Sequence, residues 1–353
     1  MLIEGIFAAI TTPFYSDERV YLRKLEANVA RYSRSLLAGI VVLGSTGEAV
    51  ELDDTETREV LRTAAEAAAA EKVLVAGISR ESVKATVELA EAAAQYNYDA
   101  VLVRTPTYYS PQMNAEAALT YFRSVADRSP LPVVLYNIPR LVPYPIPVEI
   151  VAELAQHPNI IGIKDSCGSL DNLKAILAAT SNAPKRTVTV TPVFEAVTAR
   201  MLKPAPALAD ASTFVSASAL AGGVAVVATP LVSALKTRTR EVGFQVLTGS
   251  AAITLAALEA GASGAILGFA AFAPQACQEV YFAWKDHDLK LAADKQQRIT
   301  GPSQRIVNEL GINGVKHACD FNGYYGGHAR LPLLPISVER KREIETLLAG
   351  IRS

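Results

Sequence analysis

The chain alternates short apolar runs, rich in β-branched residues, with Ala-, Leu- and Glu-rich stretches of helical spacing, and this rhythm restricts its fold more than any other feature. The runs are continuously apolar, as expected of parallel strands that are buried on both faces. Eight of them occur, at residues Gly5–Pro13, Gly39–Glu48, Lys72–Ser79, Asp99–Pro106, Pro132–Pro139, Asn159–Ser166, Phe244–Ser250 and Gly264–Ala270. Eight strand–helix units predict a (β/α)8 TIM barrel in preference to a doubly wound open sheet, because eight parallel strands close on themselves.

The helical stretches carry start signals and continue beyond the eighth strand. Residues Asp54–Ala70 form a clear helix, with Asp53 as the N-cap and Glu56 placed to complete a capping box. After the last strand, helical patterns cover Gln275–Lys285, Leu289–Leu310 and Val338–Leu348. We therefore expect a barrel over residues 1–273 and, over residues 274–353, a helical C-terminal extension that packs on the barrel.

One interval is too long for a single helix, namely the one between the sixth and seventh strands. We expect an insertion at about residues 184–241, within which the alternating Thr187–Thr191 predicts a strand. The stretch 211–235 has no charged residue and is long enough to cross a bilayer, but its serines, its threonines and Pro230 make it a poor membrane helix. The preferred interpretation is an Ala-rich segment folded over the barrel or buried between subunits.

Charge and cysteine content narrow the possible partners. The chain has 34 Lys and Arg against 35 Asp and Glu, so no basic excess is available to follow a phosphate backbone, and nucleic acid is not an expected partner. Cys167, Cys277 and Cys319 are too few and too far apart for a disulfide framework or a zinc site, and the four histidines are scattered too, so we expect a reducing compartment and no metal. We also expect no cofactor. Residues 1–5 lack the features of a secretory or import signal, which predicts a cytoplasmic protein.

The catalytic groups of such barrels lie where the strands end, and Lys164 ends the sixth strand. A lysine flanked by apolar β structure is desolvated, which favours the neutral amine, and a neutral amine can attack a ketone carbon. The alternative is a structural lysine that is paired with Asp165 or with a carboxylate of another strand. Position alone does not decide between these two interpretations.

Two further strand ends have polar groups that suit a small anionic substrate. Tyr136 ends the fifth strand, next to the sixth in a closed barrel, so that its hydroxyl could face Lys164 and shuttle a proton. The turn Gly44–Glu48 offers backbone N–H groups and two hydroxyls that could hold a carboxylate. Taken singly, such a tyrosine is commonly a packing residue, and such a turn commonly caps the next helix.

Together, Gly44–Glu48 (GSTGE), Tyr136–Pro139 (YNIP) and Gly162–Ser166 (GIKDS) resemble the dihydrodipicolinate synthase/N-acetylneuraminate lyase family in order, spacing and barrel position. Thr105–Tyr109 and Phe244–Gly249 support this resemblance, which covers nearly the whole chain except the insertion. It implies an aldolase that forms or uses pyruvate through a lysine Schiff base. It also implies a homotetrameric or dimeric barrel with a helical C-terminal extension, acting on a 2-oxo acid and an aldehyde.

The resemblance also implies individual roles. Lys164 would form the imine, Tyr136 would relay protons, and Tyr108 would enter the site of a neighbouring subunit. The remaining residues would bind the substrate: the pyruvate carboxylate would lie against Ser45, Thr46 and Gly47, with a Ser or Thr hydroxyl in the relay, and the main-chain carbonyl of Ile266 would line the pocket.

One position at which the chain differs from the family's synthases helps to indicate its branch of the family. Synthases of lysine biosynthesis have an arginine five residues after the tyrosine, where this chain has Leu141, with Arg140 one residue early. Asp320–Gly327 and Gln156–Asn159 look more like 4-hydroxy-2-oxoglutarate aldolases, and we expect that branch. The alternatives are 4-hydroxy-tetrahydrodipicolinate synthase, a ligand-binding relative without activity and, less favoured, a sugar-phosphate isomerase with a phosphate site at the Gly-rich loops after strands seven and eight.

Overall fold

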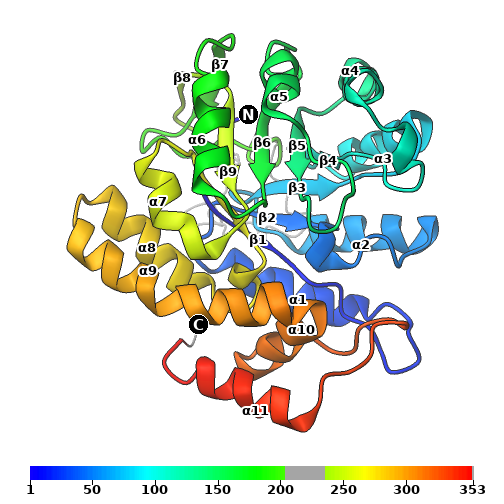
Figure 1. The fold of residues 1–353 in the computed structure, drawn as a ribbon, viewed down its shortest axis with the longest axis vertical. Coiled ribbons are helices and arrows are strands. Elements are labelled where there is room, and N and C mark those ends of the chain that lie inside the picture. The colour runs from blue at the N-terminus through cyan, green and yellow to red at the C-terminus, as the bar shows by residue number, and fades with distance from the viewer. Residues whose placement is uncertain (203–234, 352–353) are drawn as a thin grey trace, which may run out of the picture.

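The computed structural model describes residues 1–202 and 235–351 and contains a closed barrel of eight parallel strands. Around the barrel the strands follow the order β1, β10, β9, β6, β5, β4, β3 and β2 (Figure 1). Their bounds are β1 Gly5–Ala9, β2 Gly39–Val42, β3 Val73–Gly77, β4 Ala100–Arg104, β5 Val133–Asn137, β6 Ile160–Asp165, β9 Gln245–Thr248 and β10 Gly264–Leu267. Every strand lies inside one of the eight predicted runs, so the predicted barrel is confirmed.

Helices alternate with these strands and cover the outside of the barrel. They are α1 Leu22–Ser33, α2 Asp54–Ala67, α3 Val83–Gln95, α4 Ala115–Arg128, α5 Val148–Leu154, α6 Leu170–Ala179, α7 Thr254–Glu259 and α8 Pro274–Lys285. The capping box of α2 is present: Asp53 Oδ1 accepts from the Glu56 N–H (2.8 Å), and Glu56 Oε2 accepts from the Asp53 N–H (3.2 Å). Two donors that a helix start leaves unpaired are thereby satisfied.

Alternation along each strand separates two buried layers. Side chains such as Val134 and Tyr136 of β5 point into the barrel, whereas Val133 and Leu135 pack outward against the helices. The same alternation divides the end of β6, where Lys164 faces inward and Asp165 faces outward toward α6.

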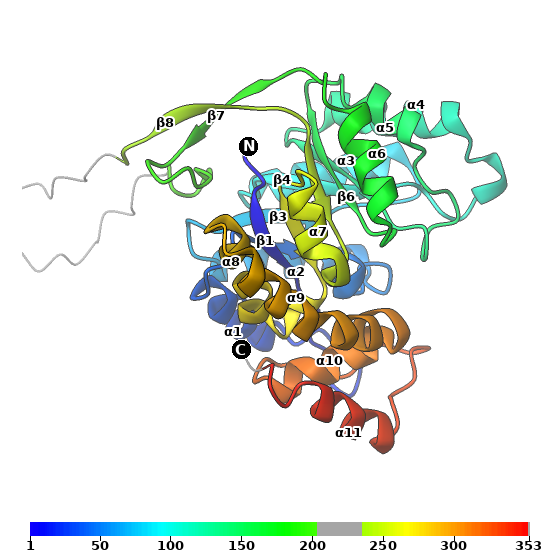
Figure 2. The same cartoon turned by 60° about the vertical axis from the view of Figure 1, so that its left-hand side comes forward.

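The C-terminal helices are α9 Leu289–Ser303, α10 Gly311–Phe321 and α11 Val338–Leu347, with a π-helical turn at Gln304–Glu309. Helix α9 packs alongside α8, whereas α10 and α11 lie beyond the carboxyl ends of the strands, on the side opposite the N-terminus (Figure 2). The predicted single helix Leu289–Leu310 is therefore divided into an α-helix and a π-helical turn. Helix α10 was not predicted, because Gly311 and Gly314 each lower helix propensity by about 1 kcal/mol. The division of the chain at residue 273 stays a prediction.

The interval between β6 and β9 contains an antiparallel pair, β7 Arg186–Val190 and β8 Arg238–Val242, which is separate from the barrel sheet (Figure 2). Strand β7 confirms the strand predicted at Thr187–Thr191, whereas β8 was not predicted, since its charged residues mask any apolar run. Most of the uncharged stretch 211–235 lies outside the described residues. Among the helices that are described, none is long and apolar enough to cross a membrane.

Candidate functional site

Lys164 and Tyr136 are register partners on adjacent strands β6 and β5. The Lys164 Nζ atom lies 4.2 Å from the centroid of the Tyr136 ring, and the two residues are only 4% and 5% exposed. Within the described part of the chain, no carboxylate lies within ion-pair distance of Lys164, and the Asp165 carboxylate is bound by Asn137 instead (2.7 Å). A lysine paired with Asp165, the structural alternative, is therefore not what the geometry shows.

The turn after β2 approaches this pair from the opposite side of the barrel. Ser45–Gly47 form one 3₁₀ turn, and Ser45 Oγ lies 3.3 Å from the Tyr136 hydroxyl. Thr12 Oγ1 donates to the Gly47 carbonyl (2.6 Å), which fixes the end of the turn. Lys164, Tyr136 and Ser45 are thus arranged in one line, from the amine over the phenol ring to a second hydroxyl.

A cavity of about 620 Å³ opens above these groups at the carboxyl ends of the strands. Its polar lining includes Ser45, Thr46, Tyr136, Lys164, Ser166 and Ser250. Two glycines make room in it. A Cβ at Gly249 would lie 1.8 Å from Ser166 Oγ, and a Cβ at Gly268 would lie 3.1 Å from Thr46 Oγ1. The Ser166 side chain leaves no room for a Cβ at Gly249, whereas a Cβ at Gly268 would only require a slight shift of the Thr46 side chain.

A second cavity of about 490 Å³ adjoins the first and shares Ser45, Tyr136, Leu141, Ile312 and Leu333 with it. Ser79 and Arg104, at the ends of β3 and β4, line its polar side. The Arg104 guanidinium donates to the carbonyl of Thr105 (2.8 Å) and lies 3.4 Å from Glu81 Oε1. The two cavities together leave room for a substrate that extends from Lys164 toward Arg104.

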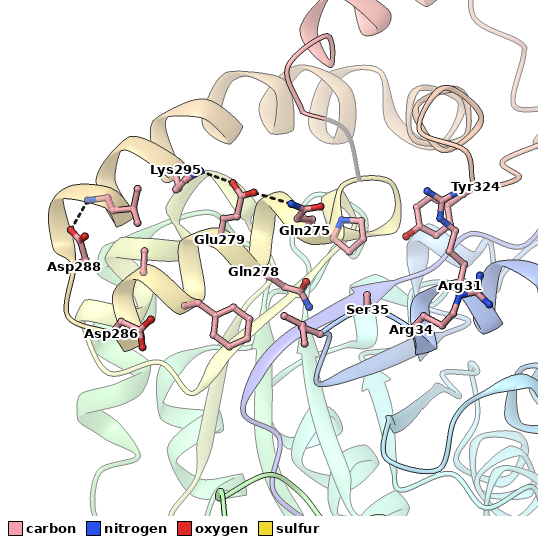
Figure 3. A pocket seen from close by; sticks show the side chains of 15 residues that line it. Arg31, Arg34, Ser35, Gln275, Gln278, Glu279, Asp286, Asp288, Lys295 and Tyr324 are labelled. Atoms are coloured by element: carbon pink, nitrogen blue, oxygen red, sulfur yellow. Dashed lines mark hydrogen bonds and ion pairs between the residues drawn. The ribbon is translucent and has the colours of Figure 1, made fainter.

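A larger cavity, of about 820 Å³, lies outside the barrel between α1, α8 and α9 (Figure 3). The lysine that lines it, Lys295, is paired with Glu279 (2.9 Å), and Glu279 also accepts from Gln275 (3.2 Å). Lys295 in this cavity is therefore held in an ion pair, whereas Lys164 at the barrel mouth has no carboxylate partner among the described residues. The barrel mouth is the candidate site.

A hydrogen-bond network lies directly behind the Lys164–Tyr136 pair. Asp165 accepts from Asn137 Nδ2 (2.7 Å), from Asn172 Nδ2 (3.2 Å) and from Cys167 Sγ (2.9 Å). Burial first, and then the Asp165 carboxylate, raise the pKa of the Cys167 thiol to about 11, so the thiol stays protonated as a donor. Asn137 also accepts from the Ile146 N–H (3.1 Å) and so connects the network to the loop after β5.

Leu141 and Arg140, in the loop after β5, make different contacts. Leu141 is 56% exposed and lines both cavities. Arg140 also reaches the larger of these two cavities, but its guanidinium donates to the main-chain carbonyls of Asn308 (2.5 Å) and Val307 (3.4 Å) in the π-helical turn. Its donors are therefore directed at the C-terminal extension.

Three predicted site residues lie apart from this group. Tyr108, which follows β4, is 79% exposed and packs edge to face against Tyr109 (5.1 Å). Gly47, the last residue of the turn, is buried, as is Ile266 in β10, and neither lines either cavity at the barrel mouth. The geometry brings Lys164 together with Tyr136, Ser45 and Thr46 within one chain, and it does not bring Tyr108 to them.

Sequence reasoning missed the part of the cavity wall that the C-terminal extension supplies. Ile312 and Val315 of α10 and Leu333 of the following loop line the barrel mouth. Nothing in their sequence marks them, because isolated aliphatic residues in a helix are indistinguishable from ordinary core. Ser79 and Arg104 had a usable signal, since each stands at or just beyond a strand end.

Comparison with curated proteins finds relatives along the whole chain. L-threo-3-deoxy-hexylosonate aldolase of Hypocrea jecorina is 30% identical and aligns over 99% of this chain and 95% of its own length. The 4-hydroxy-tetrahydrodipicolinate synthase of Methanothrix thermoacetophila is 26% identical over 98% of this chain and 96% of its own length.

Solved structures show the same fold. A dihydrodipicolinate synthase from Acinetobacter baumannii, complexed with pyruvate, superposes with a TM-score of 0.78 at 24% identity, covering 99% of this chain and all of that one. A prophage protein of the dihydrodipicolinic acid synthase family from E. coli K12, also in complex with pyruvate, superposes with a TM-score of 0.77 at 24% identity, covering 99% of each chain.

The sequence model of the dihydrodipicolinate synthetase family matches residues 2–188 and 224–351. The unmatched residues 189–223 fall inside the interval between β6 and β9 where an insertion is predicted. The matched parts contain every strand of the barrel, the Lys164–Tyr136 pair and the three helices of the C-terminal extension. The family resemblance inferred from the sequence is thereby confirmed, and the chain belongs to the dihydrodipicolinate synthetase family.

Proposed function

We propose that the protein is a pyruvate-dependent aldolase that forms a Schiff base between Lys164 and a 2-oxo acid. The single observation that supports this most strongly is the buried Lys164 amine over the Tyr136 ring (4.2 Å), at the bottom of a cavity and without a carboxylate partner among the described residues. An amine that is not engaged in an ion pair can serve as the nucleophile toward a carbonyl carbon. The relatives named as an aldolase and as a synthase support the same class of reaction.

The proposed reaction begins when the neutral amine of Lys164 adds to the C2 carbonyl. The Tyr136 phenol gives its proton to the departing oxygen, so that water leaves and a protonated imine and a Tyr136 phenolate remain. In the cleavage direction, the substrate's C4 hydroxyl gives its proton to the Tyr136 oxygen, the C3–C4 bond breaks, and an aldehyde departs. The electron pair of the broken bond remains as an enamine. Tyr136 returns the proton to C3, which restores the protonated imine. Water then hydrolyses this imine to pyruvate and the free Lys164 amine, and the proton released goes back to the Tyr136 oxygen.

The hydroxyls around this pair suit proton transfer and carboxylate binding. Ser45 Oγ is 3.3 Å from the Tyr136 hydroxyl and extends the relay away from Lys164. Ser45 and Thr46 line the cavity, and their side chains and turn would hold the substrate carboxylate. The family resemblance adds Gly47 and the main-chain carbonyl of Ile266, but the Gly47 N–H donates to the Gly44 carbonyl (2.9 Å), and neither residue lines the cavity in the single chain.

We propose cleavage of a 4-hydroxy-2-oxo acid, such as 4-hydroxy-2-oxoglutarate, as the favoured reaction. Leu141 faces the cavity where the lysine-biosynthesis synthases have an arginine, and the donors of Arg140 are directed at the carbonyls of residues 307 and 308. The aldolase relative from Hypocrea jecorina supports carbon–carbon cleavage. The second candidate is 4-hydroxy-tetrahydrodipicolinate synthase, which the name of the Methanothrix thermoacetophila relative favours.

We propose that the enzyme is a homotetramer or dimer in which Tyr108 enters the site of a neighbouring subunit. Its ring and that of Tyr109 are both exposed in the single chain. The loop that presents them is nevertheless ordered by Glu81, whose carboxylate accepts from the N–H groups of Thr107 (2.8 Å) and Tyr108 (2.9 Å). Burial of Glu81 raises its pKa, but these hydrogen bonds together outweigh burial and hold the pKa below its usual value.

Borohydride reduction in the presence of pyruvate tests the Schiff base directly. A reduced adduct should appear on the peptide that contains Lys164, as read by mass spectrometry, and Lys164→Ala should abolish both the adduct and turnover. Lys72 is a matched internal control, because it is also buried but donates to the carbonyls of Ser35 (2.6 Å) and Leu37 (3.0 Å) at the amino ends of the strands. An adduct on another lysine contradicts the assignment of Lys164. No adduct on any lysine contradicts the Schiff base and favours a ligand-binding protein without activity.

A further inference from the structure

We propose that Lys316, on α10 of the C-terminal extension, is a positioning residue for the substrate-carboxylate turn Ser45–Gly47. The inference rests on the proposed function, since it assigns the turn to carboxylate binding. It makes the C-terminal extension part of the active site rather than a covering for the barrel.

The Lys316 ammonium is buried where the extension meets the barrel. Its side chain is 1% exposed, and so is the side chain of Glu48, whose Oε1 lies 2.6 Å from Lys316 Nζ. Nζ also donates to the main-chain carbonyls of Thr12 (2.9 Å) and His328 (2.5 Å). The ammonium is therefore held by one ion pair and by two hydrogen bonds to main-chain carbonyls.

Two of those oxygens lead to the turn. Glu48 is the residue that ends it, and its backbone is left-handed (φ 53°), a conformation that a residue with a side chain adopts only when its surroundings hold it there. Thr12 reaches the turn from the other side, because its hydroxyl donates to the Gly47 carbonyl (2.6 Å) while its own carbonyl accepts from Lys316. A single ammonium thereby fixes both the residue after the turn and the threonine that holds the turn's last carbonyl.

The cost of burying this pair argues against an incidental contact. Burial raises the pKa of Glu48 and lowers the pKa of Lys316, and in each case the partner charge opposes the shift. Two charges brought out of water gain little net stability over an apolar pair of the same size, but they impose a specific geometry. Carboxylate binding needs that geometry, because hydrogen bonds to the substrate weaken steeply when donors are displaced or tilted.

The effect should appear in pyruvate affinity. Lys316→Met alone leaves a buried Glu48 carboxylate without its partner and should lower the melting temperature. The double variant Lys316→Met/Glu48→Gln removes both charges, so it should recover most of the melting temperature while the turn is no longer held. We expect it to need roughly tenfold more pyruvate for half-maximal borohydride trapping, a loss on the scale of one misplaced charge-assisted contact.

Lys72→Met is the matched control, since Lys72 is a buried lysine that donates to two carbonyls far from the turn. It should change the melting temperature without changing the pyruvate concentration for half-maximal trapping. If the double variant folds and traps pyruvate at the wild-type concentration, Lys316 has only a structural role and the inference is wrong. If the wild type itself yields no adduct, the proposed function fails, and this inference fails with it.

Discussion

Asn137 donates through Nδ2 to Asp165 Oδ1 at 2.7 Å on the outer face of the barrel, directly behind the inward-facing pair of Tyr136 and Lys164. The two pairs occupy consecutive positions of the same register on β5 and β6. Because strand side chains alternate, a shift of this outer pair would move the inner pair as well. The outer hydrogen bond therefore helps to set the position of the Lys164 amine over the phenol ring.

Asn137→Ala should lower the free energy of unfolding by about 1–3 kcal/mol, the usual cost of leaving a buried polar group short of a partner. It removes the donor to Asp165 and the acceptor for the Ile146 N–H. Urea unfolding measures the loss. Asn172→Ala is the control, since it removes a longer contact to the same carboxylate (3.2 Å) and should cost less. Equal losses of unfolding free energy in the two variants would show that the hydrogen bond from Asn137 stabilises the protein no more than the one from Asn172.

Tyr136→Phe should keep the fold and still form the pyruvate adduct, but turnover should fall by roughly 10²–10⁴, the scale of a positioned proton-transfer group. The ring that packs under Lys164 is retained, and only the hydroxyl that meets Ser45 Oγ is lost. Steady-state kinetics measure the turnover, and circular dichroism checks that the fold is kept. If turnover stays near that of the wild type, Tyr136 is not the proton-transfer group, and the role must be assigned to Ser45, Thr46 or Tyr108.

Leu141→Arg should increase kcat/KM for pyruvate with aspartate semialdehyde relative to cleavage of 4-hydroxy-2-oxoglutarate. A charge-assisted contact to a second carboxylate typically stabilises by about 1.5–3 kcal/mol, so a change of roughly tenfold or more is expected. Leu36→Arg is a control, because Leu36 is also an exposed leucine but lies at the cavity outside the barrel. A wild type that already prefers aspartate semialdehyde would contradict the proposed branch and support the synthase.

The stabilising effect of Glu56 should depend on pH. Two hydrogen bonds from the Arg330 guanidinium lower the pKa of Glu56 in the folded protein. The unfolded chain therefore binds the proton first, and the stabilisation is fully present above the ordinary glutamate pKa, about 4.3, and disappears as pH falls through the lowered folded value. The difference in unfolding free energy between wild type and Glu56→Gln, measured by denaturant titration, should be constant near neutrality and shrink below that pH. A difference that grows in acid would contradict this assignment.

Local sequence was sufficient for the barrel and for the centre of the candidate site. A short run of apolar β-branched residues bounded by turn residues favours a strand buried on both faces, and eight such strands close into one ring. Adjacent strands that both end at the same edge bring Tyr136 and Lys164 together whatever the loops do, so their proximity followed from the strand order. The capping box of α2 is equally local, since its two residues are three positions apart.

Which residues of the C-terminal extension cover the candidate site was decided only by the tertiary structure. The pairing of Glu48 with Lys316 joins residues from opposite ends of the chain, and no spacing in the sequence indicates it. Helix α10 forms although Gly311 and Gly314 disfavour it, because packing against the barrel offsets weak propensity. Each strand forms because its own residues are apolar and must be buried, a property that is visible in the local sequence. The wall over the barrel mouth was determined by contacts between distant segments, which only the assembled fold brings within reach.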